Sequence, residues 1–108
     1  MALRGKAKRE IQAGVDKLEE FTCGNVSGRR GAYGGTGRLP ADLARGLREA
    51  QAEGRLEYVL YSYWTPMAWR IDGEWTFPDE SYSATTSNHQ GVMRTAISNP
   101  GLYTDARW

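Results

Sequence analysis

The spacing of hydrophobic residues in the first half of the chain predicts two amphipathic helices with a glycine-rich loop between them. We expect the first helix within residues 1–22 and the second within residues 39–54. Pro40 stands in the first turn of the second helix, and Gly54 follows its last apolar position, as is typical of a helix start and a helix end. Residues 23–38 contain six glycines and form the predicted loop, with room for a short strand near its start.

The second half of the chain has the pattern of an antiparallel sheet. Tyr, Val, Leu and Trp dominate the start of residues 56–86, and large side chains alternate onto both faces of the expected strands. Asp72-Gly73 stands between two apolar runs and predicts a two-residue hairpin loop, because a type I′ turn needs positive φ at both positions. In this register Arg70 lies opposite Trp75.

A third helix is expected over residues 87–98, where apolar side chains again recur at helical spacing. Ser87 followed by Gln90 has the spacing of a capping box, in which the hydroxyl accepts a hydrogen bond from a free amide of the first turn. Pro100 lies just beyond the helix and helps to end it, which leaves residues 99–108 as a tail.

This order of elements predicts a single α+β domain over residues 1–108. A small antiparallel sheet of three or four strands, with one Asp-Gly hairpin, is expected to carry about three helices on one face. A chain of 108 residues has room for one modest core, and 40% hydrophobic with 25% charged residues is ordinary for a folded protein.

The cysteine and histidine contents limit the chemistry of the chain. One Cys excludes an internal disulfide, and one His excludes the usual multi-histidine metal sites, so we expect no metal and no cofactor. No apolar run reaches the length of a membrane span, and the charged N-terminus is unlike a signal peptide. These features favour a cytoplasmic protein with no membrane partner.

Charge and aromatic residues are distributed unevenly along the chain. Residues 1–55 carry eleven Lys or Arg against seven Asp or Glu, a net charge of +4, whereas residues 56–108 have a net charge of −3. The second half also holds ten of the twelve aromatic side chains. A basic half beside an aromatic half suits a nucleic-acid or nucleotide ligand. The alternative is that helices carry charge and sheets carry rings in many domains without such a ligand.

The candidate binding site combines the start of the third helix with the aromatic hairpin. Hydroxyl side chains and His89 gather at that helix start, where free backbone amides and the helix dipole favour an anion. Arg29-Arg30 in the glycine-rich loop is similar to the Gly-Arg segments of single-strand binding proteins. The predicted ligand-binding residues are Tyr63, Thr65, Trp69, Tyr82, Ser83, Thr85, Thr86, Ser87, His89, Gln90, Arg29 and Arg30.

An enzyme is the less favoured alternative. His89 has Ser62, Ser83, Thr86 and Ser87 as candidate hydroxyl partners, but the sequence spacing singles out no nucleophile. The G-x-S-x-G nucleophile motif is absent from the sequence, so we predict no catalytic residue.

Two sequence blocks resemble a known family. Residues 61–69, YSYWTPMAW, and residues 82–90, YSATTSNHQ, are similar to blocks in a family of small domains of unknown function encoded by bacteriophages, notably phages of actinobacteria, and by plasmids. Members tend to read SYxTPIAW and YSxTTSxHQ, and Met67 stands here where isoleucine is common. The resemblance implies a phage or mobile-element origin and hence the host cytoplasm. It implies no activity.

Two binding functions follow from these features. The first is a small accessory protein that contacts nucleic acid or a nucleotide, and the second is an inhibitor that docks on a host protein through exposed rings. Salt dependence separates the two, because phosphate contacts weaken steeply with salt and an aromatic protein interface does not.

Overall fold

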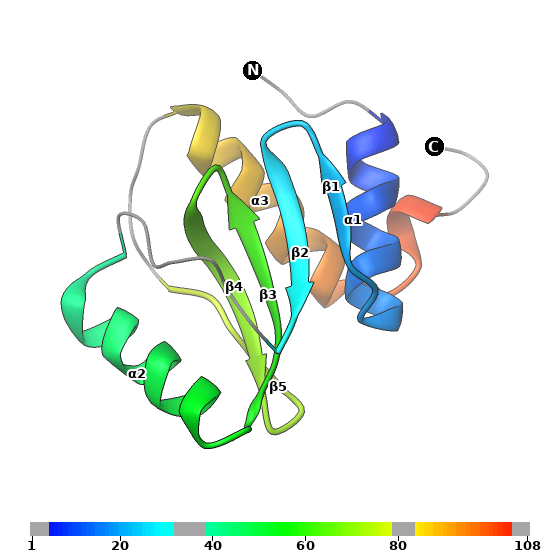
Figure 1. The fold of residues 1–108 in the computed structure, drawn as a ribbon. Helices are drawn as coiled ribbons and strands as arrows, with labels where there is room; N and C mark the ends of the chain where they lie inside the picture. The colour runs from blue at the N-terminus through cyan, green and yellow to red at the C-terminus, as the bar shows by residue number, and fades with distance from the viewer. Residues whose placement is uncertain (1–4, 32–38, 79–83, 105–108) are drawn as a thin grey trace.

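Within the described residues, five strands form one antiparallel sheet in which each strand pairs with the next in the chain (Figure 1). The structure, a computed structural model, describes residues 5–31, 39–78 and 84–104. Its elements are α1 (Gly5–Lys17), β1 (Phe21–Cys23), β2 (Val26–Arg30), α2 (Ala41–Ala52), β3 (Leu56–Ser62), β4 (Thr65–Ile71), β5 (Glu74–Thr76), α3 (Ala84–Ser98) and the short 3₁₀ helix η1 (Leu102–Thr104). The α+β class is confirmed, but the described part of the sheet has five strands where three or four were expected.

Helices cover both faces of the sheet, which corrects the prediction that one face carries them all. In Figure 1, α1 and α3 lie on one side of the sheet and α2 lies on the other. The cause is the double-sided pattern of β3. Tyr58 and Leu60 pack with α1 and α3, whereas Val59 and Tyr61 pack with α2. A strand that is apolar on both faces is stable when both faces are covered.

Helix α1 ends earlier than the predicted range of residues 1–22. Its buried stripe includes Ile11 and Val15, as the periodicity predicts. Leu18 then takes a positive φ of 54° and stops the helix, and the Glu19 amide donates to the Gly14 carbonyl oxygen at 3.2 Å. The chain turns there because the Phe21 ring, nine-tenths buried, belongs to the core as the first residue of β1.

The first part of the predicted glycine-rich loop is a β-hairpin. β1 and β2 pair across a turn at Gly24, and Phe21 lies opposite Gly28. Residues 32–38 of the predicted loop lie outside the described residues. The sequence allowed one short strand at Cys23 to Ser27, but not two paired strands that continue to Arg30. Glycine was taken as typical of a loop, whereas Gly28 is required inside a strand by close packing.

Glycine is required at positions 14 and 28 because α1 and β2 pack closely against the Tyr58 and Phe21 rings. A side chain at Gly14 would meet the Tyr58 hydroxyl and the Phe21 ring at 2.5 and 2.8 Å, and a side chain at Gly28 would overlap the same two rings. The Tyr58 hydroxyl donates a hydrogen bond of 2.5 Å to the Glu19 carbonyl oxygen. Burial raises the pKa of Tyr58 well above its ordinary value, so this hydroxyl stays protonated.

The Asp-Gly hairpin is confirmed. Asp72 and Gly73 have φ of 51° and 82°, as a type I′ turn requires, and Arg70 lies opposite Trp75. The Glu57 carboxylate holds this turn in place, because it accepts hydrogen bonds from Arg70 Nε at 3.1 Å and from the Gly73 amide at 2.7 Å.

Helix α2 confirms the second predicted helix with slightly narrower bounds. Leu47 and Ala50 face Val59 of the sheet, and Gly54 takes the positive φ of 74° expected at a helix end. Pro40 stands at the N-cap position with a φ of −55°.

Helix α3 begins three residues before the predicted start at residue 87. Residues 84–86, expected to end a strand, are helical, and Ser87 is an exposed residue inside the helix and not a cap. Tertiary packing is the reason. His89 and Met93 are buried one turn apart, and their contacts with β3 and with the core hold the first turns of the helix.

A buried glutamine joins α1 to the end of the chain. The Gln12 amide nitrogen donates to the Ala96 carbonyl oxygen at 3.0 Å and to Asp16 Oδ1 at 2.8 Å. Its amide oxygen accepts from the Tyr103 amide at 3.2 Å, and Asp16 Oδ2 accepts from the Gly101 amide. Residues 99–104 of the predicted tail therefore pack on the core through η1, with the Tyr103 ring buried, and residues 105–108 lie outside the described residues.

Candidate functional site

An exposed aromatic pair joins β3 to β4. Tyr63 and Trp64 form a two-residue loop between the paired residues Ser62 and Thr65. Their side chains have exposed fractions of 48% and 81%, and they are the large hydrophobic side chains that are exposed in the described part of the chain. A ring that is exposed to this extent contributes little to the core and is available to a partner.

The backbone of this turn is strained. Tyr63 has a φ of 57° whereas Trp64 does not have a positive φ, the pattern of a type II′ turn, whose first position favours glycine. A non-glycine residue there costs on the order of 1–3 kcal/mol. The Tyr63 amide donates a 2.6 Å hydrogen bond to the Asn25 carbonyl oxygen, which fixes the turn against the β1–β2 hairpin. A strained turn carrying two exposed rings is typical of a binding site.

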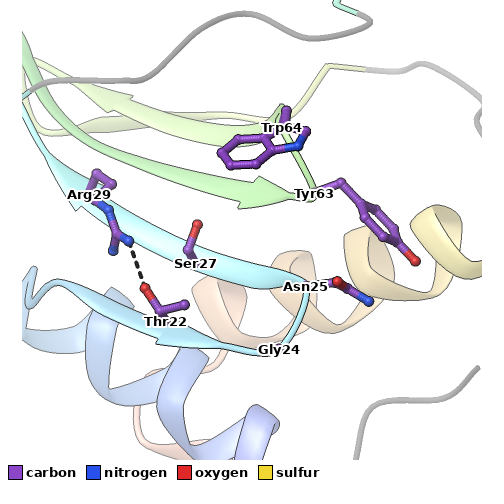
Figure 2. Close-up of a pocket in the computed structure, with 7 residues that line it drawn as sticks. All are labelled: Thr22, Gly24, Asn25, Ser27, Arg29, Tyr63 and Trp64. Atoms are coloured by element: carbon purple, nitrogen blue, oxygen red, sulfur yellow. Dashed lines mark hydrogen bonds between the residues drawn. The ribbon is translucent and has the colours of Figure 1, made fainter.

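The aromatic turn borders a hollow of about 200 Å³ on the open half of the sheet (Figure 2). We call this the β1–β2 hollow, and its lining residues are Thr22, Gly24, Asn25, Ser27, Arg29, Tyr63 and Trp64. It lies on the same face as α2, because Ser27 pairs with Tyr61 and Arg29 with Val59, and both of these partners pack under α2. Helix α2 covers the β3–β4 side of the face, and the hollow occupies the β1–β2 side.

Arg29 supplies the positive charge of the hollow. Its Nη1 donates to the carbonyl oxygens of Phe21 and Gly28 at 2.7 and 2.8 Å, and its Nη2 donates to Thr22 Oγ1 at 2.6 Å (Figure 2). All three acceptors are neutral oxygens, so these bonds orient the guanidinium without cancelling its charge. A fixed, half-buried guanidinium is well suited to an anionic group such as a phosphate.

Two further polar groups line the hollow. The Ser27 hydroxyl and the Asn25 side-chain amide have no hydrogen-bond partner in the part of the chain that the structure describes. Figure 2 shows Ser27 between Arg29 and the aromatic turn. The hollow therefore combines a cation, a hydroxyl, an amide and an exposed indole.

The predicted site residues are divided by the structure. Arg29 and Tyr63 lie in the hollow, whereas Arg30 is exposed at the end of β2, with its amide donating to Glu20 Oε2 at 3.0 Å. Thr65 and Trp69 are buried, with exposed fractions of 6% and 4%. The Trp69 ring packs under α2, so the prediction of an exposed ring at this position is wrong.

His89 lies in the interior and not on a surface. Its Nδ1 is 2.6 Å from Ser62 Oγ, and the two side chains are 3% and 1% exposed. Burial lowers the pKa of His89, so its imidazole is neutral near pH 7 and pairs with the serine hydroxyl. This is the hydroxyl–imidazole pair that an enzyme would need, but it is sealed from substrate. The His89 ring also lies 6.1 Å from the Tyr63 ring, tilted by 31°.

The remaining predicted residues lie at the start of α3. Ser87 is exposed and Gln90 is half-buried, and neither lines the hollow. Tyr82 and Ser83 lie outside the described residues, as do the side chains of Thr85 and Thr86. The described part of this helix start thus adds nothing to the hollow.

The predicted ligand-binding residues lack five of the residues that line the hollow: Thr22, Gly24, Asn25, Ser27 and Trp64. Trp64 had a signal, because it follows a run of large apolar residues at the point where the strand turns back. Its ring was one of those considered for exposure, with Tyr61, Tyr63 and Trp69, but it was not included among the predicted ligand-binding residues. The sequence indication for Ser27 was weaker: it is a polar residue that follows the apolar Val26 in β2.

The described residues contain neither a metal site nor a membrane-spanning helix. No group of three His, Cys, Asp or Glu side chains there is placed to hold a metal ion. None of the helices in the described ranges has both the length and the apolar character needed to cross a membrane.

Comparison with known proteins gives a family. The sequence model of DUF8033, a family of unknown function, matches residues 7–97. The predicted resemblance to a family of unknown function is confirmed at this level. No curated protein and no solved structure matches the chain.

Proposed function

The chain belongs to DUF8033, whose description assigns no activity, and we propose from the site itself that the protein binds single-stranded nucleic acid in the β1–β2 hollow. In this proposal the Trp64 indole stacks on a base and the Arg29 guanidinium contacts a phosphate. Such proteins combine aromatic rings, on which bases stack, with cations that follow the backbone.

The pairing of Trp64 with Arg29 across one polar hollow carries the proposal. Trp64 is 81% exposed, and Arg29 is held by three hydrogen bonds to neutral oxygens. An exposed ring alone fits many partners, and a lone cation fits many anions. A ring and an oriented cation with the Ser27 hydroxyl between them fit the base, sugar and phosphate of one nucleotide (Figure 2).

A bacteriophage or mobile-element origin is part of the same proposal, and with it a place in the host cytoplasm. It rests on the resemblance of residues 61–69 and 82–90 to the two blocks of phage-encoded domains. The protein then acts as an accessory factor on single-stranded segments of nucleic acid.

Fluorescence anisotropy with short labelled oligonucleotides, measured at several salt concentrations, tests this function. We expect binding that weakens as salt rises, because phosphate contacts release counterions. Trp64→Ala should reduce affinity about tenfold, since stacking contributes roughly 1–3 kcal/mol per base. Arg29→Gln should lower the slope of log affinity against log salt by about one.

A matched control separates the hollow from general charge. Arg48→Gln removes an exposed cation on α2 that does not line the hollow, so affinity and slope should change little. Circular dichroism on each variant checks that the fold is kept. Absence of binding to every oligonucleotide at low salt would overturn the proposal.

Docking on a host protein is the second candidate function. The exposure of Trp64 at the tip of a turn favours it, because aromatic residues in exposed turns often anchor protein interfaces. Binding to a protein partner that is lost in Trp64→Ala, kept in Arg29→Gln and insensitive to salt would support this function in place of the first.

A further inference from the structure

The order of side chains along β2 points to the sugar that the hollow accepts. Ser27 and Arg29 are alternate residues of β2 and share one face of the sheet, about 7 Å apart along the strand. The Tyr63-Trp64 turn is fixed to the chain just before β2 by the bond between the Tyr63 amide and Asn25. Ser27 therefore lies between the cation and the aromatic turn (Figure 2).

A nucleotide has the same order of groups. Its sugar joins the base to the phosphate, so a base on Trp64 and a phosphate on Arg29 place the sugar over Ser27. The nearby Thr22 hydroxyl already accepts a hydrogen bond from Arg29 Nη2 at 2.6 Å. The Ser27 hydroxyl has no partner within the described ranges, so it is available to the sugar.

We propose that the hollow selects RNA over DNA, with the Ser27 hydroxyl making a hydrogen bond to a ribose 2′-hydroxyl. This rests on the proposed function and names its substrate class. The 2′-hydroxyl both donates and accepts, and so does a serine hydroxyl, so the pair forms in either direction. The 2′-hydroxyl is the group by which proteins distinguish RNA from DNA at a given position.

The test compares oligomers that differ in the sugar alone. Anisotropy is measured with oligo(U), oligo(dU) and oligo(2′-fluoro-U) of the same length and label. We expect oligo(U) to bind between about twofold and tenfold more tightly than oligo(dU), the range of one neutral hydrogen bond. The 2′-fluoro oligomer keeps the sugar shape of RNA without the hydroxyl proton, so it should bind like oligo(dU).

Variants assign the effect to Ser27. Ser27→Ala should lower the affinity for oligo(U) more than that for oligo(dU), so that the ratio of the two affinities falls to about one. Ser98→Ala, an exposed serine at the end of α3, is the matched control and should keep the preference. Because the 2′-fluoro oligomer tests the contact on the unaltered protein, the comparison does not depend on how Ser27→Ala folds.

The possible outcomes separate this inference from the proposed function. Equal affinity for oligo(U) and oligo(dU) overturns the RNA preference and leaves nucleic-acid binding standing. A preference that persists in Ser27→Ala or with the 2′-fluoro oligomer overturns the contact with Ser27. No binding to any oligomer overturns the proposed function and the inference together.

Discussion

Two regions of the sheet, the core around Tyr58 and the turn between β3 and β4, use the same kinds of residue in opposite ways. On the α1–α3 face, the Tyr58 ring is fully buried between Gly14 and Gly28, and its hydroxyl donates to a backbone oxygen. At the turn between β3 and β4, beyond the edge of α2, Trp64 is exposed over a polar hollow, and the half-exposed Tyr63 ring lies 6.1 Å from the His89 ring. The buried ring stabilises the core, whereas the two exposed rings stand on a turn that has a cost in backbone strain.

Polar groups show the same contrast. The buried Gln12 amide makes hydrogen bonds to α1, to α3 and to the backbone of η1. In the hollow, the Ser27 hydroxyl and the Asn25 amide bond to nothing in the described parts of the chain. The difference teaches that the Gln12 amide of the core is satisfied within the protein, whereas the polar groups beside the exposed ring are left to the proposed ligand.

Gly28→Ala should cause the largest loss of stability. The new methyl group would overlap the Tyr58 and Phe21 rings, and overpacking of this kind costs about 3 kcal/mol. Urea unfolding followed by circular dichroism measures the free energy of unfolding. Gly46→Ala is the matched control, since no atom lies within 4 Å of the new methyl group and alanine favours the helix by about 1 kcal/mol. Equal stability of Gly28→Ala and the wild type would contradict the packing.

Gln12→Leu should destabilise the fold by roughly 2 kcal/mol, because it leaves the Ala96 oxygen and the Tyr103 amide buried without partners. Urea unfolding measures the loss. Hydrogen exchange adds a local reading, because the Tyr103 amide should exchange faster in this variant than in the wild type. An unchanged exchange rate would show that Gln12 does not hold η1.

The sealed His89 predicts a smaller, pH-dependent effect. The pKa of His89 in the folded chain lies below its ordinary value of 6.5 because of burial, so the unfolded chain takes up the proton first as the pH falls. Stability is therefore full above 6.5 and decreases as the pH is lowered from there toward the folded pKa. Urea unfolding between about pH 7 and pH 5.5 measures this slope.

The assignment to one residue is simple, because the chain has a single histidine. His89→Asn keeps a polar group near Ser62 and does not titrate, so it should flatten the slope. If the dependence of stability on pH is unchanged in His89→Asn, it arises from other titratable groups.

Tyr63→Gly should cause the smallest change in stability, and in the favourable direction. Glycine adopts the positive φ of this position without strain, and the greater freedom of its unfolded chain offsets part of the gain, which leaves up to about 1 kcal/mol. Affinity for oligonucleotides should fall at the same time. A variant that is less stable than the wild type would show that the ring is needed for packing.

Local patterns predicted the parts of the fold that local physics decides. The Asp72-Gly73 turn needs positive φ at two positions, and this dipeptide supplies it wherever the strands lie. The β1–β2 hairpin was missed because Gly28 is explained by Tyr58, thirty residues further along the chain. Contacts between distant residues leave no local signal.

The site was predicted in part for the same reason. Arg29 and Tyr63 were identified from residue type, and both lie in the hollow. His89 was predicted to line the site because free amides and the helix dipole at a helix start favour an anion. The packing of α3 against β3 instead brings it to within 2.6 Å of Ser62, and only the tertiary structure reveals this.

The positive φ at Tyr63 gives a way to read other DUF8033 sequences. Selection for stability alone would favour glycine at this position, because glycine adopts the positive φ without backbone strain. Chains that retain a ring there keep a conformation that works against their own folding, which the proposed binding function would explain. Under that proposal, substitution at this single position distinguishes members that keep the binding function from members that have lost it.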